Sequence, residues 1–239
     1  MVDKANRVVL AIGAHPDDAE GLCGGTLAKY KDKGWKVVIA HATNGDKGHS
    51  ELSPKEVAEI RRAEAQKAAD VIGAEMVWLG LEDEFLFSDK DTRLAFIDLI
   101  RSVRPDVILC HSPEDYHPDH KAVAELTVDA SYAASLSLVK SQHTSFSTVP
   151  PILFTDTIGG IDFLPTDFVD ITEAFNRKKE MLLQHKSQRE FIKGHHELDQ
   201  ITLIEIMARF RGLQCSVQYA EGFRPFRAWP RLVAERLLP

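Results

Sequence analysis

Two four-residue segments in this chain combine side chains that can bind a metal ion and move a proton. The first is His-Pro-Asp-Asp at residues 15–18, and the second is His-Pro-Asp-His at residues 117–120. Because proline suits the first turn of a helix, residues three apart, such as His15 and Asp18, are expected to share one face. Imidazole and carboxylate ligands without thiolate favour a catalytic zinc, or a similar divalent ion, that keeps one position open for water.

The middle of each segment leaves the assignment of roles open. Asp17 is expected to point away from His15 and Asp18, and a carboxylate left beside the water would be its general base. Spacing alone does not decide which of Asp17 and Asp18 is the ligand, nor which of His117 and His120. A single segment of this kind is also typical of a helix cap. The second copy is what favours a metal site.

The elements around these segments predict an α/β fold. Short β-branched runs alternate with amphipathic stretches of helical length, which indicates βαβ units and a largely parallel sheet covered by helices on both faces. In a Rossmann-like, doubly wound sheet of order 3-2-1-4-5, the first and fourth strands are neighbours, and ligands bind outside their carboxyl ends. The two segments are therefore expected to face each other across one cleft. The predicted strands are residues 7–13, 36–43, 75–80, 106–111 and 151–157.

Helix signals are clear in the first half of the chain. Ser53 and Glu56 enclose a proline and predict a capping box, which opens a helix that runs to about Gly73. Residues 141–150 have no periodicity and are expected to form a loop.

After residue 157 the alternation of strands and helices loosens. A polar helix is expected near residues 173–188 and another at about 198–210. We expect one domain, residues 1–239, because this length suits a single large core. Its core is predicted at about residues 1–157, with a small C-terminal helical and strand cap at about 158–239.

Composition excludes several classes of partner. The chain has 29 basic and 36 acidic residues, a formal charge of −7, so nucleic acid and anionic membrane surfaces are not expected partners. No uninterrupted apolar segment is long enough for membrane insertion, and the first residues do not resemble a secretory signal, so we expect a cytoplasmic protein. The three cysteines form no Cys-x-x-Cys pair, which argues against a disulfide framework and a thiolate zinc site.

Taken together, these stretches resemble the LmbE/PIG-L family of metal-dependent amino-sugar deacetylases. The resemblance covers most of the chain, and the two His-Pro-Asp segments in this order are its most specific part. Supporting stretches are "TNGDKG", "EIRRAEAQKAADVIGA", "VDITEAFNRKKEMLLQHKSQ" and "YAEGFR".

The resemblance implies a role for each residue of the two segments. Asp17 would be the general base, and His117 would steady the oxyanion. Arg61 would contact substrate hydroxyls, although the adjacent Arg62 fits if the register slips by one. The implied zinc ligands are His15, Asp18 and His120.

Four further residues are candidates around this centre. A protonated His117 would donate best with a raised pKa, and Asp119 or Asp115 could raise it from the second shell. Tyr116 stands where many relatives carry arginine, so it bears on what the pocket offers to a sugar hydroxyl or phosphate. Asn44 follows the second strand and either lines the pocket or serves only the Asn-Gly turn.

Several conspicuous residues have simpler interpretations. The glycines at 24–25 are expected to allow close packing of helix and sheet rather than to bind phosphate. His185 is expected to be a surface helix residue without a function. Glu64 lies on a charged helix face and is expected to be solvated or paired with Arg61 or Lys67.

These inferences lead to a cytoplasmic, zinc-dependent deacetylase of an N-acetylated amino sugar or its conjugate. One alternative is an amidase of a thiol-sugar conjugate with the same core, and another is a Rossmann-like module that binds a sugar or nucleotide without turnover. Zinc can be replaced by another divalent metal at such a site. A homo-oligomer, trimer or hexamer, is expected from the resemblance.

Overall fold

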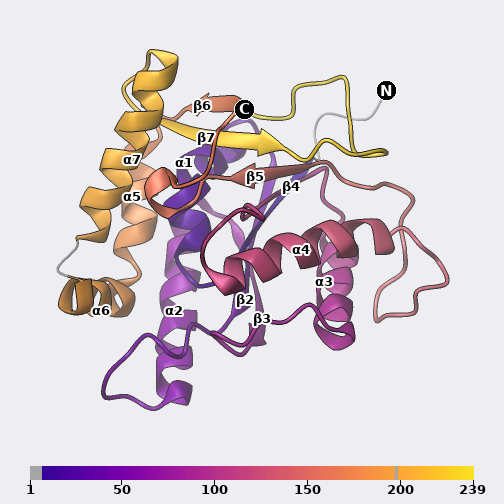
Figure 1. Ribbon diagram of the computed structural model, residues 1–239, viewed down its shortest axis with the longest axis horizontal. Helices are drawn as coiled ribbons and strands as arrows, with labels where there is room; N and C mark the ends of the chain where they lie inside the picture. Colours follow the sequence, from indigo (N-terminus) through magenta and orange to yellow (C-terminus); the bar gives the residue numbers. More distant parts are fainter. Residues whose placement is uncertain (1–6, 197–198) are drawn as a thin grey trace.

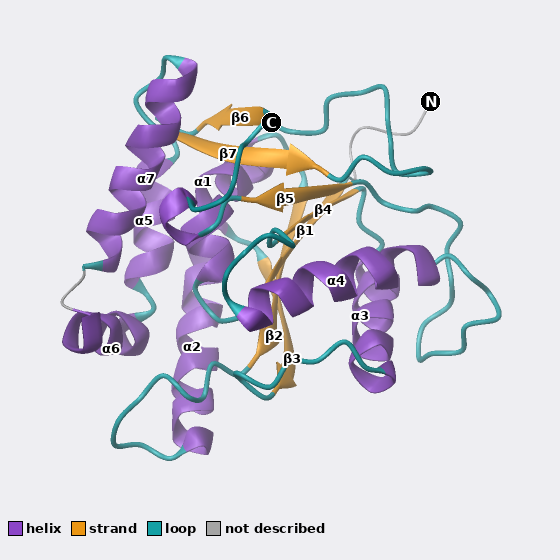
Figure 2. Ribbon diagram, viewed as in Figure 1, coloured by secondary structure: helices purple, strands orange, loops and turns teal. Residues whose placement is uncertain are grey.

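The computed structural model describes residues 7–196 and 199–239, which build one seven-stranded sheet between two layers of helices (Figures 1 and 2). The strand order is β3-β2-β1-β4-β5-β7-β6, and the first five strands are parallel. The predicted order 3-2-1-4-5 is therefore confirmed. The strands are β1 Val8–Gly13, β2 Lys36–Thr43, β3 Glu75–Leu81, β4 Val107–Cys110, β5 Ile152–Thr155, β6 Asp167–Asp170 and β7 Ala220–Pro225.

Alternate residues of the buried strands face opposite helix layers. Val9 and Ala11 of β1 pack with α1, α2, α5 and α7, whereas Leu10 and Ile12 pack with α3 and α4. Both faces of the sheet are thus covered, which explains why the parallel strands are apolar throughout. The helices are α1 Asp18–Asp32, α2 Pro54–Ile72, α3 Lys90–Val103, α4 Pro118–Ala133, α5 Phe175–Leu183, α6 Lys186–His196 and α7 Gln200–Cys215.

Local capping fixes α2 as the sequence predicts. The Ser53 side chain accepts the Glu56 backbone N–H, and the Glu56 carboxylate accepts the Ser53 N–H. Gly73 ends the helix at φ 65°, a left-handed conformation that glycine adopts without strain. This helix carries Arg61 toward the carboxyl edge of the sheet.

The C-terminal third extends the sheet as well as capping it. β7 runs antiparallel to both β5 and β6. The single helix predicted near residues 173–188 is instead two, α5 and α6, separated at Gln184 and His185. No helix in the described part of the chain is long and apolar enough to cross a membrane.

The glycines at 24–25 do serve close packing, but against the C-terminal third. A Cβ on Gly25 would lie 2.8 Å from the Ile171 side chain, which follows β6, and one on Gly24 would contact Lys178 of α5. The Gly25 N–H also donates to Glu221 of β7. Helix α1 is thereby held against the elements that complete the pocket.

Candidate active site

The candidate active site lies in a crevice at the edge of the sheet, where β1 and β4 end side by side. Ile12 of β1 pairs with Cys110 of β4 in parallel register, so the two His-Pro-Asp segments leave the sheet at the same edge. The ring centroids of His15 and His117 are 4.8 Å apart, and those of His15 and His120 are 5.4 Å apart. The strand order alone thus brings together histidines about a hundred residues apart.

One carboxylate is the centre of this cluster. Asp18 Oδ2 lies 3.3 Å from His15 Nδ1 and 3.5 Å from His120 Nε2. In the described part of the chain, three overlapping groups of histidines and carboxylates are close enough to share a metal ion, and His15, Asp18 and His120 form one of them. This group matches the two histidines and one carboxylate that hold a divalent ion in many hydrolases.

The ring nitrogens of His15 and His120 that face away from Asp18 favour these three residues as the metal ligands. His15 Nε2 lies 3.0 Å from Asp83 Oδ1 and 3.2 Å from Asp119 Oδ2. His120 Nδ1 lies 2.9 Å from Asp115 Oδ2. Metal-binding histidines usually have a carboxylate on the nitrogen that faces away from the metal, because it fixes the ring and raises its basicity. The inward nitrogens of both rings are thereby presented to Asp18.

The buried carboxylates and histidines of this cluster favour the binding of a cation. Burial lowers the pKa of His120, but the Asp18 and Asp115 carboxylates outweigh it and raise that pKa to about 9. Asp18 is held well below its usual pKa, against its burial, by His120, His111 and His15. A divalent ion between these groups supplies the positive charge that protons otherwise provide, so the donor set fits a metal.

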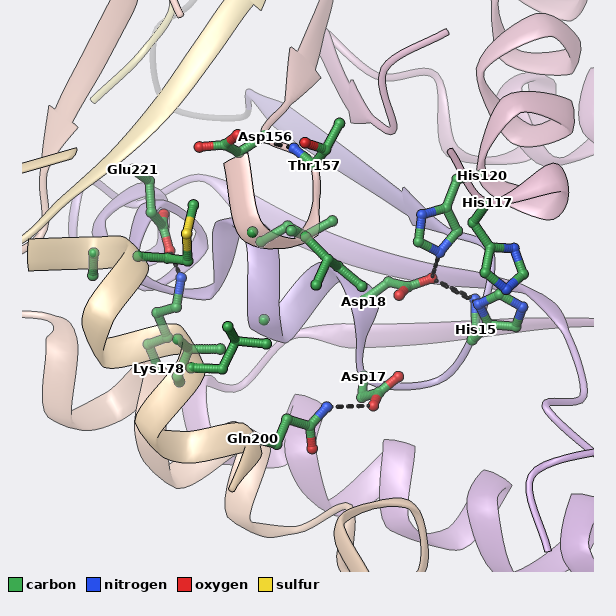
Figure 3. Close-up of a pocket in the computed structure, with 18 of the residues that line it drawn as sticks. His15, Asp17, Asp18, His117, His120, Asp156, Thr157, Lys178, Gln200 and Glu221 are labelled. Atoms are coloured by element: carbon green, nitrogen blue, oxygen red, sulfur yellow. Dashed lines mark hydrogen bonds and ion pairs between the residues drawn. The ribbon is translucent and has the colours of Figure 1, made fainter. Parts of the chain in front are cut away.

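Asp17 stands apart from this cluster and faces the pocket. Its backbone has φ 111°, which turns the side chain away from Asp18, and α1 begins only at Asp18. The expectation that Pro16 occupies the first turn of the helix is therefore wrong. Gln200 Nε2 donates to Asp17 Oδ2 at 2.7 Å (Figure 3). Burial raises the pKa of Asp17, partly offset by Arg61, which suits a proton acceptor at neutral pH.

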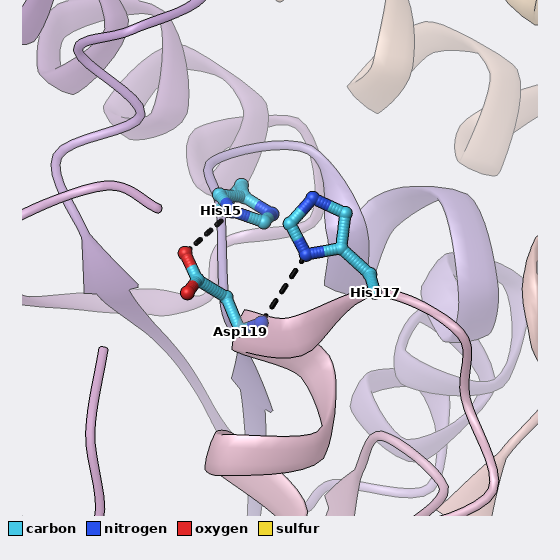
Figure 4. A group of neighbouring side chains, drawn as sticks. All are labelled: His15, His117 and Asp119. Carbon is cyan, nitrogen blue, oxygen red and sulfur yellow. Dashed lines mark hydrogen bonds and ion pairs between the residues drawn. The ribbon is translucent and has the colours of Figure 1, made fainter. Parts of the chain in front are cut away.

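His117 caps α4 with its own ring. The Asp119 N–H donates to His117 Nδ1 at 3.2 Å, so the neutral ring carries its proton on Nε2 (Figure 4). Burial lowers the pKa of His117. The expected raising of this pKa by Asp119 or Asp115 is wrong, because their carboxylates instead contact His15 and His120. His117 can donate from Nε2 as a neutral imidazole.

Arg61 is buried, whereas its neighbour Arg62 is exposed. Arg61 donates to the carbonyl oxygens of Gly45 and Pro16, at 2.9 and 2.5 Å, and its Nη2 lies 3.4 Å from Asp17 Oδ1. The guanidinium thus holds the turn that presents Asp17, which is a different task from the predicted contact with substrate hydroxyls.

The other two predicted substrate contacts differ in position. Tyr116 lines the pocket and is 54% exposed. Asn44 is engaged on both sides of its amide, accepting from Trp78 Nε1 and donating to the Gly80 carbonyl. Its side chain ties the end of β2 to β3, so it neither lines the pocket nor bonds its own Asn-Gly turn.

A single pocket of about 390 Å³ contains the candidate catalytic groups and extends well beyond them. Figure 3 shows the histidines on one side of this space and the buried Lys178–Glu221 pair on the other. Several lining residues come from α6 and α7, which are distant from both His-Pro-Asp segments in the sequence.

Sequence reasoning missed Asp83 and Gln200 and misjudged His185 and Glu64. His185 is fully buried, with Nε2 3.3 Å from a carboxylate oxygen of Glu20. The break between α5 and α6 turns this histidine inward, so the surface assignment is wrong. Glu64 is also buried and accepts from the N–H and hydroxyl of Ser187 in the first turn of α6. The "LEDEF" stretch was the only local sign of Asp83, and Gln200 had none.

Comparison with known proteins shows the family to which the chain belongs. The family described as PIG-L, GlcNAc-PI de-N-acetylase, matches residues 10–131, a stretch that contains both His-Pro-Asp segments. The chain belongs to the PIG-L family. The family suggested by the sequence is thereby confirmed.

Proteins similar to this chain include enzymes named for different activities. The diacetylchitobiose deacetylase of Thermococcus kodakarensis is 29% identical over 91% of this chain and 82% of its own. The structure of N,N'-diacetylchitobiose deacetylase from Pyrococcus horikoshii superposes with a TM-score of 0.81 at 28% identity, covering 92% and 84% of the two chains. The 4-oxalmesaconate hydratase of Pseudomonas putida is 28% identical over 72% of this chain and 70% of its own.

Proposed function

We propose that this protein is a metal-dependent hydrolase that removes the acyl group, acetyl in the simplest case, from an N-acylated amino sugar or its conjugate. The observation that carries the proposal is Asp17, a buried carboxylate beside the ligand group but outside it. A module that only binds a sugar or nucleotide needs no such base. The named deacetylases among the relatives support the amide as the bond that is broken.

The ligand group proposed for the metal is His15, Asp18 and His120, with zinc as the expected ion and other divalent metals as substitutes. When bound, the ion supplies a Lewis acid that lowers the pKa of a water and polarises the substrate carbonyl. Asp83, Asp119 and Asp115 keep the rings in place from outside.

Asp17 moves the proton, and His117 stabilises the developing charge. Asp17 takes the proton of the attacking water, and burial, which raises its pKa, makes it a stronger base. His117 donates a hydrogen bond from its Nε2–H to the oxyanion that develops on the carbonyl oxygen, and it keeps that proton. Asp17 then returns its proton to the departing amine.

Gln200 orients the Asp17 carboxylate. A carboxylate only accepts, so the Gln200 amide nitrogen faces Asp17 and its Oε1 points away from it. This oxygen is buried without a hydrogen-bond partner among the described residues. Tyr116, at the exposed side of the pocket, is proposed to contact the sugar.

The test is acetate release from a panel of N-acetylated sugars, by enzyme stripped with a chelator and by enzyme reconstituted with zinc. Release restored by the metal supports the proposal. Asp17→Asn should keep its zinc and lose about 10²- to 10⁴-fold in kcat, the range of general-base catalysis. Asp91→Asn, an exposed carboxylate of α3, is the matched control and should change nothing. Loss of zinc in Asp17→Asn would instead make Asp17 a ligand, and metal-loaded enzyme without release would favour binding alone.

A further inference from the structure

The pocket continues past the metal-binding residues toward α5 and α7. At one side it is bounded by Tyr116 and His117, which are partly exposed. At the other side it passes between α1 and α7 and reaches Lys178 on α5. We call this second part the arm.

The walls of the arm are apolar and come from four elements. Apart from Ile158, which is exposed, their side chains are buried or half-buried, and they lie on α1, α6, α7 and the short 3₁₀ helix Ile158–Gly160. The two glutamines that also line the pocket lie toward its catalytic end, since Gln200 bonds Asp17 and Gln188 packs against Gly48 beside Arg61. The apolar lining residues are Leu22, Ile158, Phe191, Ile192, Leu203, Ile204 and Met207.

The charged side chains at the far end are already neutralised. Lys178 Nζ lies 2.6 Å from Glu221 Oε1, and that carboxylate also accepts the N–H groups of Gly25 and Thr26. Arg211 makes a two-point contact with Asp156, at 2.5 and 2.9 Å. Because both cations are paired with buried carboxylates, the arm has no spare charge for a phosphate or a carboxylate group.

The amine side of the substrate amide carries the sugar and the other side carries the acyl chain, and the two parts of the pocket differ in polarity. Sugar hydroxyls need hydrogen-bond partners or water, which the exposed side beside Tyr116 provides. An aliphatic chain gains most from the arm, where its methylenes leave water. We propose, building on the function proposed above, that the substrate carries an N-acyl chain longer than acetyl and that the arm holds this chain.

The reaction balances as an ordinary amide hydrolysis. The C–N bond breaks, water provides the new oxygen of the released carboxylic acid, and the amine keeps the returned proton. The free amine is therefore the same product for every acyl length, which gives one readout for a whole series.

The experiment compares N-acetyl-, N-butanoyl-, N-hexanoyl- and N-octanoylglucosamine with the zinc-loaded enzyme, measuring the amine released. We expect kcat/KM to rise about fourfold per added methylene until the arm is filled, as the burial of each methylene predicts. Values that stay flat or fall with chain length, while N-acetylglucosamine is still hydrolysed, would overturn the arm assignment and leave the hydrolase intact.

Two tryptophan variants on α7 locate the effect. Met207 lines the arm and is half-buried, so Met207→Trp should reduce the ratio of octanoyl to acetyl kcat/KM at least tenfold. Leu213 lies on the same helix, is 78% exposed and is outside the pocket lining, so Leu213→Trp should keep the wild-type ratio. An unchanged ratio in Met207→Trp would overturn the assignment.

The octyl glycoside of N-acetylglucosamine tests the opposite orientation. If this compound gains kcat/KM and N-octanoylglucosamine does not, the arm holds an aglycone and the proposal is wrong. If no compound is hydrolysed, the proposed function fails, and calorimetric binding to zinc-loaded Asp17→Asn decides the arm separately. Tighter binding of N-octanoyl- than of N-acetylglucosamine then supports it, and equal binding overturns it.

Discussion

The two His-Pro-Asp segments are nearly the same in sequence and different in structure. In the first, Asp17 has φ 111° and the helix begins at Asp18. In the second, the helix begins two positions earlier in the segment, at Pro118, and Asp119 is an ordinary helical residue. The third-position aspartate consequently faces the pocket in one copy and packs behind the metal-binding residues in the other.

The surroundings explain the difference. In the first segment Arg61 binds the carbonyl of Pro16, and Asp18 Oδ2 accepts the N–H of His15, so the turn closes before the helix starts. In the second segment the His117 ring accepts the Asp119 N–H and caps the helix directly. A repeated motif therefore supplies a base in one copy and a support in the other, because tertiary contacts choose the backbone conformation.

Among the variants that test the difference between the two segments, Arg61→Gln is expected to have the largest effect. Removing the guanidinium takes the Arg61 donor from two buried carbonyls and leaves the Asp17 carboxylate with Gln200 alone. We expect the free energy of unfolding to fall by about 3 kcal/mol, the range for breaking a buried charged pair. Denaturant unfolding measures it.

Arg62→Gln is the matched control for that loss, since Arg62 is the neighbouring residue on the same helix and is exposed. It should unfold within about 0.5 kcal/mol of the wild type. Equal destabilisation by the two variants would mean that Arg61 does not hold the first segment.

A smaller effect is expected from Asp119→Asn. The Asp119 carboxylate accepts the N–H groups of Glu84 and Leu86 and contacts His15 Nε2. Weakening this support should lower zinc affinity by about 10- to 100-fold. Competition with a chromophoric chelator measures the zinc affinity.

Glu125→Gln, an exposed change on the same helix α4, serves as the control and should bind zinc like the wild type. Asp119→Asn with full zinc affinity would show that Asp83 alone orients His15, because its carboxylate contacts the same ring nitrogen.

The parts of the site that follow from strand order were predictable. Apolar runs separated by helices determine a parallel sheet, and the 3-2-1-4-5 order places residues 15–18 opposite residues 117–120. The capping box at Ser53 marks α2 from four residues of sequence. Such features depend on local patterns and on the topology of one sheet, both of which a sequence contains.

The rest depends on packing between distant elements. Gln200 reaches Asp17 across 183 residues, and no spacing rule connects them. By periodicity His185 belongs to one polar helix. The helix nevertheless breaks at this residue, where the His185 ring lies against the buried Glu20. Glu64 has the pattern of a solvated helix face and instead binds the start of α6. When an element later in the chain buries a charged side chain, the residues next to that side chain in the sequence give no sign of the burial.

The smallest expected effect comes from glycine and alanine variants, which distinguish the backbone conformation of each segment from the role of its aspartate side chain. Asp17→Gly and Asp17→Ala both remove the carboxylate, but only glycine adopts φ 111° without strain, so the glycine variant should be more stable by about 1–2 kcal/mol. At position 119 the order should reverse by up to about 1 kcal/mol, because alanine favours a helix. Thermal unfolding of the four variants measures both differences. The same order at both positions would mean that the two segments share one backbone conformation, and the division between base and support would then need another cause.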